Sequence, residues 1–382
     1  MRHVILASLG VAALGLVLLG VELGFEGQRA LFAYTAGFAF ALSTSLGALI
    51  FLLIVNTGHV VWIIPLRRLL ESAAATLPIY LLLFLPIALG YRTLYPWAHP
   101  DDFTSEHVHR QLLATAHWMS PRLVFLRAYG YMLVWAAVSH FLRKDSVLQD
   151  KTGADALTDR QRALSAAMIP VVGLTATFAS FDWFMSLVPG WYSDLYGVYF
   201  FAGGLLGAVG LVAVLTWAAK RAELLPPGVG PSHLSAVGRV MLMSVIFWTY
   251  IGVATLILIW TADLPHEVLF LAQRIAGAWA LIAGILVFGH FLVPFLALLS
   301  RDMKRHAEPL ALLGAWLVLM HAFDSYWLVM PSLGRSPHIL DAGGALAVGG
   351  LVVAFGAWRS SLADPYPVRD PNLARALRYE SE

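Results

Sequence analysis

Two stretches of this chain, FDWFMSLVP at 181–189 and FDSYWLVMP at 323–331, share one pattern. Each places an aspartate, Asp182 or Asp324, inside strongly apolar sequence, with an aromatic residue two positions later and a proline seven positions later. A carboxylate in apolar surroundings is costly and is usually retained for pairing or for function. The repeated pattern therefore raises the question of where in the fold the two aspartates lie.

The composition places them in a membrane. Hydrophobic residues make up 59% of the chain and charged residues 13%, and the mean hydropathy is +0.74. Soluble proteins contain about 45–50% apolar and about 25% charged residues, and a membrane-spanning helix needs about 20 predominantly apolar residues. Ten such stretches are present, at roughly 4–24, 31–55, 73–91, 121–142, 162–188, 195–218, 239–261, 268–299, 309–330 and 341–358. The sequence predicts an all-α polytopic membrane protein with ten transmembrane helices.

Little sequence remains for other structure. The longest polar connections, around 92–120 and 143–161, are too short for a separate globular domain. The chain has no cysteine, which removes disulfides, iron–sulfur ligation and thiol catalysis. The apolar run after Arg2 and His3 is longer than a signal-peptide core and has no clear cleavage site, so we interpret it as the first helix.

Lysine and arginine are distributed unevenly between alternate connections. Eighteen lie on the side of the N-terminus: Arg2, Arg67, Arg68, Arg143, Lys144, Lys151, Arg160, Arg162, Lys220, Arg221, Arg239, Arg301, Lys304, Arg305, Arg359, Arg369, Arg375 and Arg378. Six lie on the other side, namely Arg29, Arg92, Arg110, Arg122, Arg274 and Arg335, and Arg127 lies inside the fourth span. The positive-inside rule then predicts that both termini are cytoplasmic.

The twin motifs indicate an internal repeat. They fall on the fifth and ninth spans, which run in the same direction, so the period is four helices. A parallel repeat of this kind predicts two four-helix bundles, helices 2–5 at about 31–188 and helices 6–9 at about 195–330. Helices 1 and 10 would flank these bundles, and residues 1–382 would form a single transmembrane domain.

Few other ionisable groups fall inside the spans. His290 is expected in the inner third of the eighth helix, and His321 near the middle of the ninth, one turn before Asp324. With Asp182 they form a candidate ladder of titratable groups for proton transfer. A structural interpretation stays open, in which the aspartates cap a broken helix or pair with Arg127 or Arg274 and the histidines bond to backbone carbonyls.

The placement of the histidines along the sequence disfavours haem and metal ligation. A membrane-embedded haem needs two imidazoles at one depth, whereas His59, His140, His290 and His321 come from different helices and only the first three could share the inner side. No HxxxH or HxxE spacing occurs within a span, so no metal site is expected. The runs GGLLGAVG at 203–210 and GGALAVGG at 343–350 indicate close helix packing rather than nucleotide loops.

Longer stretches resemble a known family. They are TFASFDWFMSLVPGWYSDLYGVYFFAGG (177–204), IFWTYIGVATLILIWTADLPHE (246–267), HFLVPFLALLSRDMKR (290–305) and HAFDSYWLVMPSL (321–333). Together they resemble the ActF membrane subunits of bacterial alternative complex III, a quinol:cytochrome c oxidoreductase, within the wider group of NrfD-like and PsrC-like anchors. The chain departs from that pattern at Ala254 and Thr255, which replace a Ser-Gln pair and remove a candidate polar link.

The resemblance implies a place in a respiratory or photosynthetic electron-transfer chain of a bacterial inner membrane. It implies partners of the ActA type with c-type haems, the ActB type with iron–sulfur clusters, the membrane subunit ActC, and ActD and ActE. A cytochrome c or a terminal oxidase would accept the electrons, and membrane lipids would surround the chain. We expect no redox centre bound by this chain, a quinone or quinol nearby, and no nucleic-acid partner.

Three functions remain open at this stage. The chain is a non-catalytic subunit that moves protons through Asp182, His290, His321 and Asp324, or it is a quinol-oxidising anchor. In the second case Asp182, Asp324 and Tyr326 would bind the quinol head. The third function is a secondary transporter, which the parallel repeat alone allows.

Overall fold

The computed structural model describes residues 1–380, apart from the side chain of His266. Within this part of the chain all regular structure is helical, and ten helical segments are long and apolar enough to cross a membrane. They are Arg2–Phe25, Gly27–Thr57, Ile64–Leu89, Pro121–Thr152, Asp155–Leu187, Tyr196–Arg221, Pro231–Ala262, Ala278–Leu299, Ala307–Leu333 and Ile339–Ser360. The prediction of an all-α protein with ten spans is therefore confirmed.

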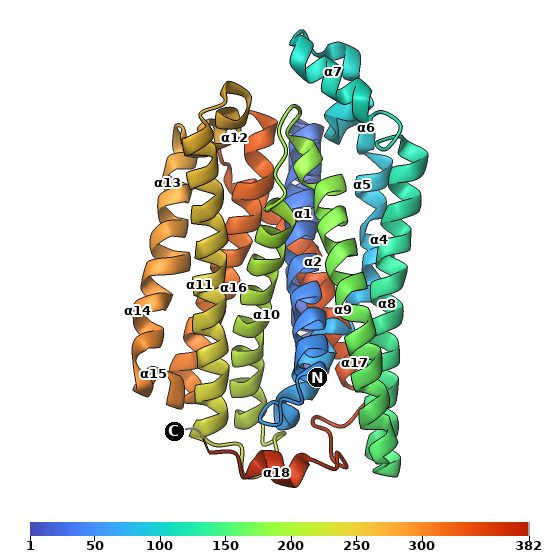
Figure 1. The fold of residues 1–382 in the computed structure, drawn as a ribbon, viewed down its shortest axis with the longest axis vertical. Helices are drawn as coiled ribbons and strands as arrows, with labels where there is room; N and C mark the ends of the chain where they lie inside the picture. Colours follow the sequence, from blue (N-terminus) through green and yellow to red (C-terminus); the bar gives the residue numbers. More distant parts are fainter. Residues whose placement is uncertain (381–382) are drawn as a thin grey trace.

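The ten spans stand side by side and both chain termini lie at the same end of the molecule (Figure 1). We call this the termini end; it also carries the short helices α15 (Arg301–Arg305) and α18 (Leu373–Leu377). The far end carries α7 (Glu106–Thr115) and α12 (Pro265–Ile275). An even number of spans places the termini together, as the sequence predicts.

Helix α2 (Gly27–Thr57) is the centre of the fold, because 89% of its apolar window is buried. On one side it packs against α3 (Arg67–Ala74) and α9 (Asp155–Trp183), and α9 packs against α8 (Pro121–Thr152). On the other side it packs against α10 (Tyr196–Arg221) and α16 (Ala307–Val329), which contact α11 (Pro231–Ala262). Helix α2 thus touches both groups of helices and can transmit polar contacts between them.

Glycines set the closest helix contacts. A methyl group placed on Gly47 of α2 would lie 2.2 Å from the carbonyl oxygen of Gly204 on α10, a distance that no side chain tolerates. Helices α1 (Arg2–Phe25) and α17 (Ala342–Ser360) meet in the same way, since a methyl on Gly15 would lie 2.2 Å from the Ala347 nitrogen. Small residues let backbones approach and gain dispersion energy where lipid removes the hydrophobic driving force.

Several predicted spans differ from the structure in length, as the fourth does by ending at Thr152 instead of 142, and the third and eighth also contain breaks. The third span begins at Ile64 instead of 73 and is broken into α3, α4 (Tyr80–Leu83) and α5 (Leu85–Leu89), because Pro78 and Pro86 remove backbone donors. The eighth span begins at Ala278 instead of 268, because α12 is a separate helix. Gly277 has a positive φ of 54° and turns the chain between the two helices.

The eighth span is also irregular at its centre. It consists of α13 (Ala278–Ile285), the π-helical segment η6 (Leu286–Leu292) and α14 (Val293–Leu299). Single π-turns within helices are frequent at functional sites. Because this segment carries His290, the break in the regular helix falls where a titratable side chain enters the core.

Candidate functional site

Asp324 is the centre of a buried polar cluster in the second group of helices. It lies on α16 with 3% of its surface exposed. The Tyr199 hydroxyl on α10 donates to Asp324 Oδ1 at 2.5 Å, and the Trp248 indole Nε1 on α11 donates to Oδ2 at 3.2 Å. Three helices therefore deliver one carboxylate and two donors to a single point, and neither donor is a cation.

His321 lies one turn from Asp324 and connects it to α2. Its Nδ1 is 3.8 Å from Asp324 Oδ2, and its Nε2 is 2.8 Å from the hydroxyl oxygen of Ser43. The Ser43 hydroxyl also lies 3.1 Å from the carbonyl oxygen of Phe40, and the tautomer of His321 decides whether Nε2 or the hydroxyl donates in the Ser43–His321 contact. Nδ1 faces the Asp324 carboxylate and has no hydrogen-bond partner among the described residues.

His290 completes the cluster. It is fully buried, its ring centroid lies 4.3 Å from Trp248 and 6.4 Å from His321, and neither ring nitrogen has a partner within the described part of the chain. The structure brings the two imidazoles close together, and the expected difference in depth between His290 and His321 stays a prediction. His290 lies on the π-helical segment η6 and His321 on α16.

The glycine run of α10 makes room for these side chains. A methyl group on Gly203 would lie 2.9 Å from His321 Cε1, and one on Gly207 would lie 2.7 Å from His321 Cδ2. The imidazole therefore packs directly on the α10 backbone. The predicted role of this run in close packing holds, and it packs against the His321 side chain as well as against a helix.

Asp182, the other aspartate of the twin motif, is held very differently. Arg127 donates to it through Nε at 2.9 Å and through the second terminal nitrogen at 3.0 Å, and the Trp118 indole donates at 3.2 Å. The Arg127 guanidinium also lies 3.9 Å from the centroid of the Trp118 ring. Asp182 has no exposed surface, so this two-point ion pair is the structural alternative that the sequence left open for it.

Arg274 does not pair with a carboxylate among the described residues. Its guanidinium is 1% exposed, donates to the carbonyl oxygens of Phe270 and Leu328 at 3.0 and 2.7 Å, and lies 3.8 Å from the Phe270 ring centroid. Burial lowers the pKa of Arg274 to about 10, which still leaves it charged at neutral pH. Leu328 follows Asp324 by one turn on α16, so this cation stands at the far-end side of Asp324.

Tyr326 belongs to a different cluster, at the far end of α1 and α2. Its hydroxyl donates to Asp341 Oδ2 at 2.5 Å, and Arg29 contacts both Asp341 oxygens at 2.8 Å. Glu22 lies 3.0 Å from Arg29 and has one buried oxygen without a partner among the described residues. The side chains Asp182, Asp324 and Tyr326 thus occupy three separate settings. Sequence reasoning missed Glu22 and Asp341, which stand near the ends of apolar stretches.

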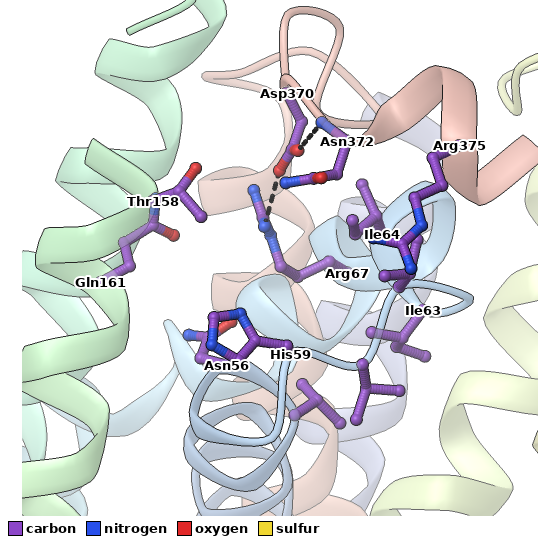
Figure 2. Close-up of a pocket in the computed structure, with 13 residues that line it drawn as sticks. Asn56, His59, Ile63, Ile64, Arg67, Thr158, Gln161, Asp370, Asn372 and Arg375 are labelled. Carbon is purple, nitrogen blue, oxygen red and sulfur yellow. Dashed lines mark hydrogen bonds and ion pairs between the residues drawn. The ribbon is translucent and has the colours of Figure 1, made fainter. Parts of the chain in front are cut away.

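A second set of missed charges lies at the termini end. Arg67 and Arg68 on α3 bind Glu71, Asp150 and Asp370; Arg67 Nε lies 3.1 Å from Glu71 and its Nη1 lies 2.8 Å from Asp370, while Arg68 bonds to Asp150. Figure 2 shows Arg67 reaching toward Asp370 and Asn372 beside a pocket. The sequence does contain a signal for this cluster, because Glu71 follows Arg67 by four positions. Counting lysines and arginines alone did not reveal it.

Comparison with known proteins adds no family to this geometry. No protein-family model matches the chain, and no curated protein matches it significantly. No group of three or more metal-ligating side chains is found within the described residues. The fold and the Asp324 cluster define a polytopic all-α membrane protein with a buried carboxylate, tyrosine and histidine set, which can bind and pass protons.

Proposed function

We propose that the chain is an integral membrane subunit of a quinol:cytochrome c oxidoreductase of the alternative complex III type, and that it carries a proton pathway through Asp324 and His321. Haem and iron–sulfur clusters would belong to partner subunits. The motif stretches quoted above support the family assignment. The proton pathway is supported by one arrangement, a buried carboxylate 3.8 Å from a histidine nitrogen that has no hydrogen-bond partner among the described residues.

The chemistry of this pair favours proton transfer over a structural role. A structural ion pair brings its partners within hydrogen-bond distance, as Arg127 and Asp182 do at 2.9 and 3.0 Å. Asp324 and His321 lie 3.8 Å apart, so a small side-chain adjustment would bring them within hydrogen-bond distance. Tyr199 continues the set on the other side of Asp324, and Ser43 continues it toward α2. These groups can accept and donate a proton in turn.

The first experiment tests assembly. The tagged chain, purified from its native membrane in mild detergent, should elute with multihaem cytochrome and iron–sulfur subunits, detected by haem staining and optical spectra. Elution of the chain alone would contradict the assignment to an oxidoreductase complex.

The second experiment tests the proton pathway. The purified complex is reconstituted into vesicles, and the protons moved per electron are measured with a pH-sensitive dye during quinol oxidation. D324N should lower this ratio while haem content is unchanged. D263N is the matched control, because Asp263 is exposed at the end of α11 and has a positive φ of 46° that asparagine tolerates. An unchanged ratio in D324N would refute the pathway.

A further inference from the structure

A buried carboxyl group that the proposed function leaves unused lies near the far end of α1. Helix α1 has only 22% of its apolar window buried, yet Glu22 on this helix is 3% exposed. Its carboxyl group faces Arg29 of α2 and His338, which precedes the short helix η8 (Ile339–Asp341). Glu22 therefore stands where α1 meets the rest of the protein, away from the Asp324 cluster.

One guanidinium group lies beside two carboxyl groups at this point. Arg29 donates through Nε to Asp341 Oδ1 and through Nη2 to Asp341 Oδ2, both at 2.8 Å. The Tyr326 hydroxyl at 2.5 Å and the backbone N–H of His338 at 2.9 Å also donate to Asp341 Oδ2. Asp341 is therefore neutralised by Arg29 and is fully supplied with hydrogen-bond donors.

Glu22 receives none of these hydrogens. Its Oε1 lies 3.0 Å from Arg29 Nε, but this nitrogen has a single hydrogen, which is donated to Asp341. Glu22 Oε2 is buried and has no partner among the described residues. A buried carboxylate beside a second carboxylate and without a donor is strongly disfavoured, and a bound proton removes its charge. A proton needs no pocket, because it bonds to the oxygen itself.

His338 connects this carboxyl group to the solution at the far end. Its Nδ1 lies 3.9 Å from Glu22 Oε1, and its side chain is 51% exposed. The backbone N–H of Leu340 donates to Nδ1 at 3.4 Å, so the neutral ring has its lone pair on Nδ1 and its proton on Nε2. The nitrogen nearest to Glu22 is thus a proton acceptor. The remaining charged neighbour, Glu26, is paired with Arg335 at 3.3 Å.

We propose that Glu22 binds a proton and exchanges it with the solution at the far end through His338. On release, the O–H bond of the Glu22 carboxyl group breaks and an N–H bond forms at His338 Nδ1, after a side-chain adjustment that closes the 3.9 Å gap. The imidazolium then passes its Nε2 proton to water, and uptake follows the reverse order. Release leaves a second anion beside Arg29. The inference does not depend on the pathway through Asp324.

The bound proton is measured by infrared spectroscopy of the full-length chain in detergent. A protonated carboxyl group has a C=O band above those of carboxylates and amides, and the band shifts in D2O. The wild type should show this band at neutral pH and lose it toward alkaline pH. E22Q should lack the Glu22 band, whereas E22D, which keeps the carboxyl group on a shorter side chain, should show it at a changed frequency. E26Q is the matched control, because Glu26 lies one turn away, is 35% exposed and is paired with Arg335.

The rate of exchange tests His338. After a jump to alkaline pH, the Glu22 band should fade about tenfold or more slowly in H338N than in the wild type, and E26Q should keep the wild-type rate. Asparagine can still accept the Leu340 N–H, so H338N keeps the local fold. No band in the wild type, a band that ignores pH, a band that persists in E22Q, or one unshifted in E22D would overturn proton binding at Glu22. An unchanged rate in H338N would overturn the route through His338.

Discussion

The two aspartates of the twin motif should differ strongly in how much stability the same substitution costs. Asp182 accepts three N–H donors, two from Arg127 and one from Trp118, and none of these donors can become an acceptor. In D182N the amide NH2 must face one of these N–H donors, so that hydrogen bond is lost. Arg127 also loses its counter-charge, although its side chain is only 15% exposed. Removing one partner of a buried ion pair costs about 3–5 kcal/mol.

Asp324 tolerates the same change because one of its donors is reversible. In D324N the amide oxygen can accept from Trp248 Nε1, while the amide nitrogen donates to the Tyr199 hydroxyl, which rotates to accept. Both hydrogen bonds survive and no cation is left unpaired. The expected loss of stability is about 1 kcal/mol or less, the net value of one ordinary hydrogen bond.

Equilibrium unfolding in mixed micelles measures this contrast directly. D182N should shift the midpoint strongly and D324N only slightly, and the double variant R127Q/D182N should recover part of the loss, because the unpaired cation is gone. Equal effects of D182N and D324N, or no recovery in the double variant, would refute the reasoning that separates a structural aspartate from a titrating one.

Three further predictions follow from the packing, the buried cation and the topology. G47A should cost about 1–3 kcal/mol, because its methyl group meets the Gly204 carbonyl at 2.2 Å, whereas G10A, with nothing within 4 Å, should be neutral or stabilising by about 0.5–1 kcal/mol; equal unfolding midpoints would contradict this. R274Q should raise passive proton leak of proteoliposomes and R274K should not, since a fixed charge repels cations; an unaltered leak in R274Q would rule out this barrier. A reporter at the C-terminus should read cytoplasmic and one inserted near Asp102 periplasmic, and a swapped result would reverse every inner and outer assignment.

The sequence alone determined the class of protein and the number of spans. Apolar length is a local property, and a run of about 20 apolar residues has no other stable setting. The same locality explains the errors. The third and eighth spans were misplaced where Pro78, Pro86 and Gly277 interrupt the chain, and hydropathy does not register a helix break inside apolar sequence.

Only the tertiary structure decided what the polar groups do. The motifs around Asp182 and Asp324 share one local pattern, yet one carboxylate meets Arg127, 55 positions away, and the other meets Tyr199, 125 positions away. These partners depend on the rotation and depth of neighbouring helices, to which a π-helical turn and a glycine run contribute. The motif predicts that a carboxylate is buried. The neighbouring helix then determines whether its hydrogen-bond partner is a cation or a hydroxyl group.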